Sequence, residues 1–112
     1  MDHISLYGMY IKERQSFETE EDAYGFITYK INGDEVFVND IFVMPLFRNQ
    51  HVGTSLGDRV TEIAKIKGCK RMVAHIYPST HGSNEALIGF MTKYKMRITG
   101  CHENLIVLKK EL

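Results

Sequence analysis

The sequence predicts a single α/β domain, residues 1–112, built on one mixed sheet. Three observations carry this prediction: a β-rich N-terminal third around an Asn-Gly turn, an amphipathic helix over residues 54–67, and a short apolar strand after it. A helical crossover between two strands makes them parallel neighbours in one sheet. The expected element order is βββ-α-β-α-ββ.

The N-terminal third is predicted to form three antiparallel strands. Residues 4–13 are rich in Ile, Tyr and Leu with rough alternation, which predicts the first strand. The polar run 15–22 predicts a loop, and residues 23–31 and 35–44 predict the next two strands. Asn32-Gly33 lies between these two strands, and Asn-Gly is the strongest short-range hairpin signal.

The rest of the chain alternates helix and strand. In the segment 54–67, Leu56, Val60 and Ala64 recur at helical spacing, and Gly68 suits a helix C-terminus. The further elements expected are a strand at 71–77, a helix at 84–95, and strands at 97–102 and 105–109.

Composition excludes several classes of protein. Fourteen basic residues balance fourteen acidic ones, so the basic footprint of a duplex-DNA-binding protein is absent and no nucleic-acid partner is expected. No apolar run approaches the ~20 residues of a membrane span, and no signal pattern opens the chain, so a cytoplasmic protein is expected. Cys69 and Cys101 form neither a disulfide framework nor a Cys-x-x-Cys pair, so no metal site is predicted.

The informative segment is 43–56, where a strand ends, a short turn follows and a helix opens at once. Such a turn directs unpaired backbone N–H groups and the positive helix end at one place, which suits a diphosphate. Gly53 would let a phosphate approach the backbone closely. By spacing alone, an ordinary tight connection between strand and helix explains the segment equally well.

Val43-x-Pro45-x-x-Arg48-x-x-His51-x-Gly53 resembles the acetyl-CoA-binding motif of the GCN5-related N-acetyltransferases (GNAT family), Arg/Gln-x-x-Gly-x-Gly/Ala after a Val-x-Pro strand end. The preceding run 39–42 is similar to the Glu-Asp-Leu-Phe run of polyamine-acetylating members. The resemblance covers roughly residues 23–112. It implies acetyl-CoA as co-substrate and no metal. The residues that it places at the cofactor are Phe42, Val43, Met44, Arg48, Asn49, Gln50, His51, Val52, Gly53, Thr54, Asn84, Phe90 and Met91.

The chain departs from the family pattern at three places. His51 stands at the first Gly of the turn, and Met91 stands where many members place a Tyr that protonates the departing thiolate. Met cannot donate a proton. The usual N-terminal strand–helix–helix does not fit before the motif, so a minimal domain with an open acceptor face is expected, similar to short phage-encoded acetyltransferases.

The resemblance implies direct attack of an amine on the acetyl thioester. A splay of the sheet after Val43 would expose a backbone N–H for the developing oxyanion. Asp40 is the first candidate for the base and His75 the second. Tyr94 could replace the missing proton donor. The alternatives are an Asp40 that is solvated or paired with an Arg, a His75 satisfied by a backbone carbonyl, and a Tyr94 that only supports the core.

The expected function is therefore acetyl transfer from acetyl-CoA to a primary amine, either a protein lysine or a polyamine-like acceptor. An open acceptor face favours a large acceptor, such as a protein, or a homodimer whose second copy completes the site. Met91 and His51 favour the alternative, a catalytically inert module that binds CoA or a protein partner.

Overall fold

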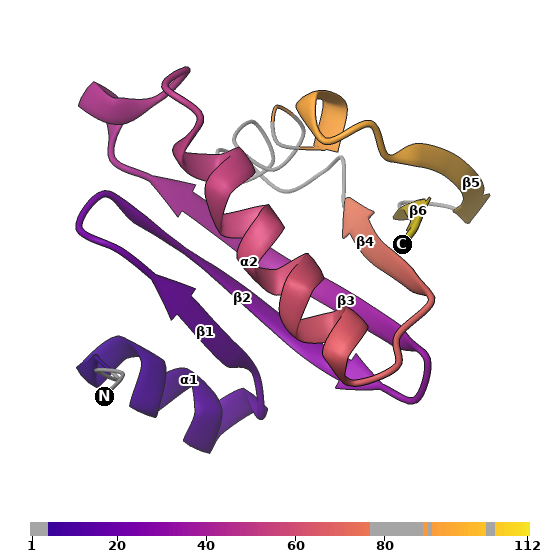
Figure 1. Cartoon of the computed structure of the whole chain (residues 1–112), viewed down its shortest axis with the longest axis horizontal. Helices are drawn as coiled ribbons and strands as arrows, with labels where there is room; N and C mark the ends of the chain where they lie inside the picture. The colour runs from indigo at the N-terminus through magenta and orange to yellow at the C-terminus, as the bar shows by residue number, and fades with distance from the viewer. Residues whose placement is uncertain (1–4, 77–88, 90, 103–104) are drawn as a thin grey trace.

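The computed structural model describes residues 5–76, 89, 91–102 and 105–112. Its centre is a six-stranded sheet in the order β1-β2-β3-β4-β6-β5 (Figure 1). The strands are β1 (Glu18–Glu21), β2 (Gly25–Asn32), β3 (Glu35–Val43), β4 (Arg71–Ile76), β5 (Arg97–His102) and β6 (Leu105–Glu111). The helices with printed bounds are α1 (Leu6–Gln15), the short 3-10 helix η1 (Pro45–Phe47) and α2 (Val52–Ile66).

The sheet is mixed, as predicted. β2 and β3 form an antiparallel hairpin around Gly33, whose φ of 61° requires the left-handed region. β3 and β4 are parallel and are joined by α2, while β4, β6 and β5 are antiparallel neighbours. The predicted strands at 23–31, 35–44, 71–77, 97–102 and 105–109 are confirmed within one or two residues at each boundary described.

The core lies between α2 and the sheet. Leu56, Val60 and Ala64 are fully buried against a layer that includes Ile27 and Val38. Figure 1 shows α2 lying across β2 and β3. The helix ends as predicted next to Gly68, which adopts a φ of 86°.

The N-terminal prediction was wrong in two places. Residues 4–13 were expected as a strand, but Leu6–Gln15 is helix α1, because Ser5 caps it by accepting the N–H of Gly8 at 2.9 Å. The run 15–22 was expected as a loop, but Glu18–Glu21 is an edge strand. One N-terminal helix therefore precedes the strands, where none was expected.

A bulge in β3 decides which way its side chains point. Thr28 pairs with Asp40 but Tyr29 pairs with Val38, so Asn39 is an extra residue in β3. Val38 faces the α2 core before the bulge, and Ile41 faces it afterwards, both buried. Without the extra residue, Asp40 would share the core face with Val38, since side chains alternate along a strand. The bulge places the carboxylate on the opposite face.

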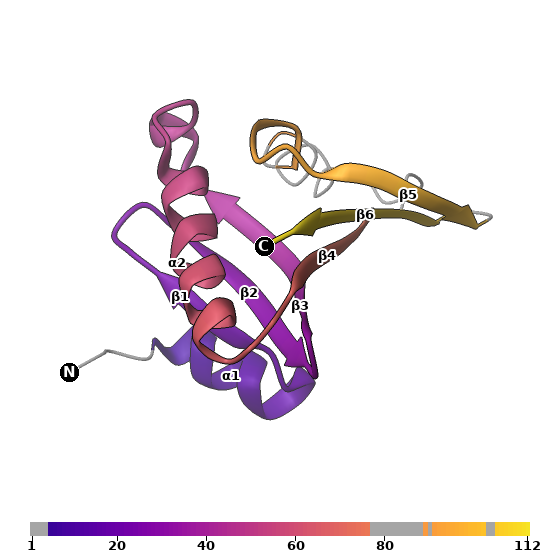
Figure 2. The ribbon, with the colours of Figure 1, turned by 45° about the vertical axis from the view of Figure 1, so that its right-hand side comes forward.

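β3 and β4 diverge in the middle of the sheet. Their last parallel pair is Val38 with Ala74, after which both strands continue without pairing to each other (Figure 2). The splay was predicted after Val43, and the structure begins it five residues earlier. The consequence is a longer stretch of β3 whose β4-facing edge has no strand partner in the described ranges.

The predicted helix 84–95 is described only in part. Of the expected helix 84–95, residues 91–93 are helical, while Asn84 and Phe90 lie outside the described residues. No helix in the described ranges combines the length and apolarity needed to cross a membrane.

Candidate active site

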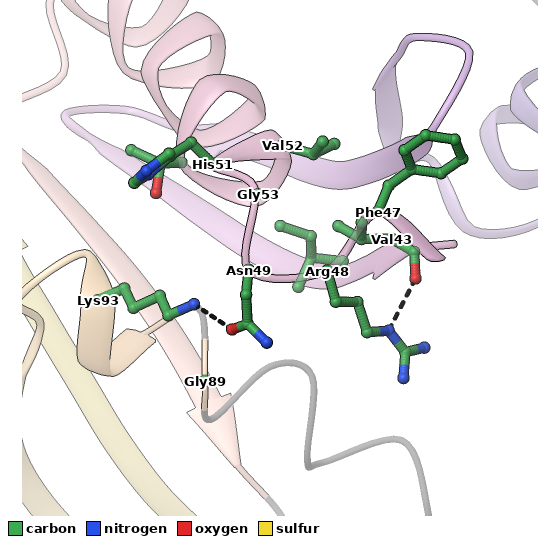
Figure 3. Close-up of a pocket in the computed structure, with 11 residues that line it drawn as sticks. Val43, Phe47, Arg48, Asn49, His51, Val52, Gly53, Gly89 and Lys93 are labelled. Atoms are coloured by element: carbon green, nitrogen blue, oxygen red, sulfur yellow. Dashed lines mark hydrogen bonds between the residues drawn. The ribbon is translucent and has the colours of Figure 1, made fainter. Parts of the chain in front are cut away.

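A pocket of about 210 Å³ opens between the end of β3, the loop before α2 and the helical residues near position 91. It lies on the α2 side of the sheet, where β3 and β4 have separated. Its lining residues are Ile41, Val43, Phe47, Arg48, Asn49, His51, Val52, Gly53, Thr54, Gly89 and Lys93 (Figure 3). The walls formed by β3 and η1 are apolar, and the α2 end is lined by backbone and polar side chains.

The loop before α2 reverses its direction with two left-handed residues. Asn49 has a φ of 64° and His51, the N-cap of α2, has a φ of 66°. The His51 side chain makes no capping hydrogen bond, and the first intrahelical donor is Ser55, which bonds the His51 carbonyl. The N–H groups of Val52, Gly53 and Thr54 therefore lack intrahelical acceptors at the positive end of the helix. This end of the pocket suits an anion.

Two cationic side chains stand at the pocket. The Lys93 Nζ donates a 2.6 Å hydrogen bond to Asn49 Oδ1, which ties residues 91–93 to the loop (Figure 3). The Arg48 Nε donates to the Val43 carbonyl at 2.9 Å, and the guanidinium lies 5.8 Å from the centre of the Phe42 ring. Both side chains are exposed, so the positive charge of the pocket is accessible to a ligand.

Asp40 lies on the other face of β3. Its Oδ1 accepts the backbone N–H of Ile41 at 2.8 Å. Burial raises the pKa of its carboxyl, and the Ile41 hydrogen bond opposes that shift. Within the described ranges, no cation lies close enough to pair with it. The carboxylate is therefore a stronger base than an ordinary surface aspartate.

His75 and Tyr94 are not among the residues that line the pocket. The His75 ring packs edge-on against Phe37, with the ring centres 4.9 Å apart. The Tyr94 hydroxyl hydrogen-bonds to Thr61 and Asp58 of α2, and Lys110 Nζ lies 3.8 Å from its ring centre. Burial is the largest cause that raises the pKa of Tyr94. These contacts match the core-supporting alternative for Tyr94.

Most of the predicted cofactor loop gathers at the pocket. The predicted residues that line it are Val43, Arg48, Asn49, His51, Val52, Gly53 and Thr54.

Four predicted residues lie elsewhere. Phe42 points to the Asp40 face, Met44 is exposed, and Gln50 bonds the Leu46 carbonyl. Met91, 1% exposed, belongs to the hydrophobic core and does not stand at the pocket surface.

The sequence analysis did not name Ile41, Phe47, Gly89 and Lys93 among the cofactor-binding residues, although all four line the pocket. Side chains alternate along β3, so recognition of the Asn39 bulge would have placed Ile41 on the pocket face and Phe42 on the opposite face. The described residues hold no cluster of three or more His, Cys, Asp or Glu side chains that could bind a metal.

Residues 5–95 match the model of the acetyltransferase (GNAT) family, which is most of the chain. The chain belongs to the GNAT family of acetyltransferases. A mouse protein, thialysine N-epsilon-acetyltransferase, is 42% identical over 48 residues. That stretch is 43% of this chain and 28% of the mouse protein, so the likeness spans less than a third of that relative.

Solved structures share the fold. The PaiA N-acetyltransferase from Thermoplasma acidophilum, in complex with coenzyme A, superposes with a TM-score of 0.68 at 18% identity, covering 80% of this chain and 54% of that one. The ribosomal-protein-S18-alanine N-acetyltransferase from Escherichia coli gives 0.66 at 14% identity, covering 96% and 76%. The anti-CRISPR protein AcrVA5 gives 0.63 at 26% identity, covering 81% of this chain and 96% of that protein.

Proposed function

We propose that this GNAT domain transfers an acetyl group from acetyl-CoA to a primary amine. The observation that carries the proposal is the pocket where β3 and β4 separate, closed at one end by the N-terminus of α2. The stretch shared with the mouse thialysine N-epsilon-acetyltransferase supports an amine acceptor.

The residues at the pocket fit acetyl-CoA. The N–H groups at the start of α2, which have no intrahelical acceptor, and the charge of Lys93 suit a diphosphate, while the Arg48 guanidinium lies over the Phe42 ring. Ile41, Val43 and Phe47 offer an apolar wall to the chain that carries the thioester. His51 and Asn49 adopt the backbone conformation that glycine adopts most readily, so the turn forms without glycine.

When bound, acetyl-CoA supplies an acetyl group activated as a thioester. The edge of β3 beyond Val38, which pairs with no strand among the described residues, offers backbone N–H groups to the oxygen on which negative charge develops. The amine nitrogen forms a bond to the acetyl carbon, the carbon–sulfur bond breaks, and its electron pair leaves on sulfur. A simple thiol has a pKa near 8.5, so the thiolate leaves without a proton donor at the Met91 position.

Asp40 is the base in this proposal. The bulge turns its carboxylate away from the core, and burial makes it a better proton acceptor. An amine approaching β3 from the Asp40 face would meet the thioester held on the α2 face at the strand's free edge. The amine proton then passes to Asp40, directly or through water.

Mass spectrometry tests the proposal. The protein is incubated with acetyl-CoA and either a mixture of small primary amines or a lysine-rich protein. A mass increase of one acetyl group on one acceptor class, dependent on acetyl-CoA, is the expected result. Calorimetric binding of acetyl-CoA without transfer to either class would instead identify an inert CoA-binding module.

A protein acceptor is the second candidate. The anti-CRISPR protein AcrVA5 is covered over 96% of its length at 26% identity, so that relative is also a domain of about this size. The acceptor face here is flanked by a single N-terminal helix, α1, in the described residues. Acetylation of a folded protein but of no small amine in the same assay would establish this candidate.

A further inference from the structure

The face of β3 opposite the pocket carries a carboxylate that forms no ion pair within the described part of the chain. The pairs Thr28–Asp40 and Phe26–Phe42 place Asp40 and Phe42 on the same face, next to Phe26. The Ile41 N–H is the hydrogen-bond donor that the structure gives Asp40, and no described cation lies within ion-pair distance. A half-buried carboxylate in this state favours a cationic ligand.

A row of three aromatic rings lies beside this carboxylate. The Tyr7 ring, from α1, lies 4.8 Å from the Phe26 ring, and the Phe26 ring lies 5.8 Å from the Phe42 ring. Tyr7 and Phe42 are each 40% exposed, so part of each ring is open to a ligand. Burial and then the Asp40 charge raise the pKa of the Tyr7 phenol.

A positive charge lies at the Phe42 end of this row. The Arg48 guanidinium stands 5.8 Å from the centre of the Phe42 ring. A ligand on these rings therefore meets a negative charge at Asp40 and a positive charge beyond Phe42. One cationic group is favoured beside Asp40, and a second cationic group is repelled by Arg48.

We propose that Tyr7 binds the acceptor, and that the acceptor is a primary amine on an aliphatic chain with no second cation. The amine sits at Asp40 and the methylene groups lie on the exposed rings of Tyr7 and Phe42. This inference rests on the proposed acetyl transfer and narrows its acceptor, disfavouring polyamines. Tyr7 acts as a specificity-determining residue, since it contacts the chain that carries the amine.

The test is a series of linear primary amines from propylamine to hexylamine, assayed at saturating acetyl-CoA. In the unmodified protein, kcat/KM rises by up to about fourfold for each added methylene, because each is removed from water. In Tyr7→Ala the dependence on chain length flattens, whereas Tyr7→Phe keeps the ring and the dependence. Hexamethylenediamine is a poorer acceptor than hexylamine, because its second ammonium group approaches Arg48.

Tyr10→Ala is the matched control. Tyr10 is on the same helix and is 54% exposed, but its ring contacts Arg14. Tyr10→Ala therefore keeps the length dependence. Calorimetry with acetyl-CoA shows that each variant is folded and binds the co-substrate. A general structural defect would lower kcat/KM for all amines by the same factor and leave the dependence of kcat/KM on chain length unchanged.

The outcomes separate this inference from the proposed function. No transfer to any amine, free or in protein, overturns the proposed function and this inference with it. Transfer with an unchanged slope in Tyr7→Ala, or a preference for the diamine, overturns this inference alone. An Nα-blocked lysine amide presents the same chain, so its rate relative to pentylamine distinguishes a protein side chain from a free amine. A fall of both rates relative to propylamine in Tyr7→Ala supports the proposal.

Discussion

The side-chain amide of Asn39 donates a 3.1 Å hydrogen bond to the buried hydroxyl of Thr28, at the point where β2 and β3 change register. Thr28 is fully buried and pairs with Asp40. The bond therefore joins the extra residue of the bulge to the residue opposite the proposed base. This contact stabilises the arrangement that puts Ile41 at the pocket and Asp40 on the other face.

Asp40→Asn should lower kcat by about 10²- to 10⁴-fold without changing acetyl-CoA affinity, because the amide cannot accept the amine proton. The substitution should also remove the acid limb of the pH–rate profile. That limb lies above the usual range for aspartate, since burial raises the Asp40 pKa. Steady-state kinetics across pH check both effects. Unchanged turnover would show that Asp40 is not the base.

The same substitution should stabilise the fold at neutral pH. The folded pKa of Asp40 is raised above the ordinary value of 3.8. Between pH 3.8 and the folded pKa, the folded state therefore binds more protons than the unfolded state. Stability is therefore lost as pH rises through this window, and Asn avoids the loss. Thermal melting should give a higher Tm for Asp40→Asn at pH 7. The difference should shrink as pH falls toward 3.8.

His51→Gly should raise the free energy of unfolding by about 0.5–1 kcal/mol. A non-glycine residue in the left-handed region costs roughly 1–2 kcal/mol, and the extra entropy of unfolded glycine offsets part of the gain. His51 has a φ of 66° and no capping bond to lose. Urea denaturation measures the effect. Asn49→Gly is the control, with a smaller gain expected because Asn tolerates this conformation better than most residues. A loss of stability in His51→Gly would contradict the prediction.

Gly25→Ala should destabilise the protein by about 1–3 kcal/mol and weaken acetyl-CoA binding. A Cβ at Gly25 would lie 2.3 Å from the Phe42 carbonyl oxygen, so the end of β3 must move, and the pocket wall at Val43 moves with it. Gly100→Ala is the matched control in β5, since the nearest atoms to its Cβ are 4.0 Å away. Chemical denaturation and calorimetry on both variants measure the contrast. Equal effects would mean that the close approach at Gly25 does not control the site.

Tyr94→Phe should cost about 1 kcal/mol of stability and leave kcat near the unmodified value. The hydroxyl is bonded to Thr61 and Asp58, and its removal takes away those contacts but keeps the ring beside Lys110. Denaturation and steady-state kinetics measure the two quantities. A large fall in kcat with intact acetyl-CoA affinity would instead identify Tyr94 as the proton donor.

Much of the fold follows from local pattern. The Asn32-Gly33 hairpin, the apolar stripe of α2 and the β4 run each carry a clear period, and the parallel β3–β4 pair follows from the crossover. Helix α1 was missed because Tyr7, Tyr10 and Ile11 favour strand by composition, while its decisive signal is the Ser5 cap.

The loop residues that line the pocket were predictable from sequence, and the face of β3 that carries Asp40 was not. The loop 48–54 is contiguous, so its motif places most pocket residues at once. Which face Asp40 and Phe42 occupy depends on the Asn39 bulge, a one-residue change in tertiary pairing. The contact between the Tyr7 and Phe26 rings joins α1 to β2. Because residues 4–13 were predicted as a strand, the sequence analysis could not predict this contact.

Calorimetric titration of acetyl-CoA into the unmodified protein and into Gly53→Leu tests the central claim most directly. Gly53 lines the pocket in the first turn of α2, where a leucine side chain would occupy the space of the diphosphate. The account predicts saturable binding by the unmodified protein and none by Gly53→Leu, with both proteins folded by thermal melting. No binding by the unmodified protein, or undiminished binding by the variant, would contradict it.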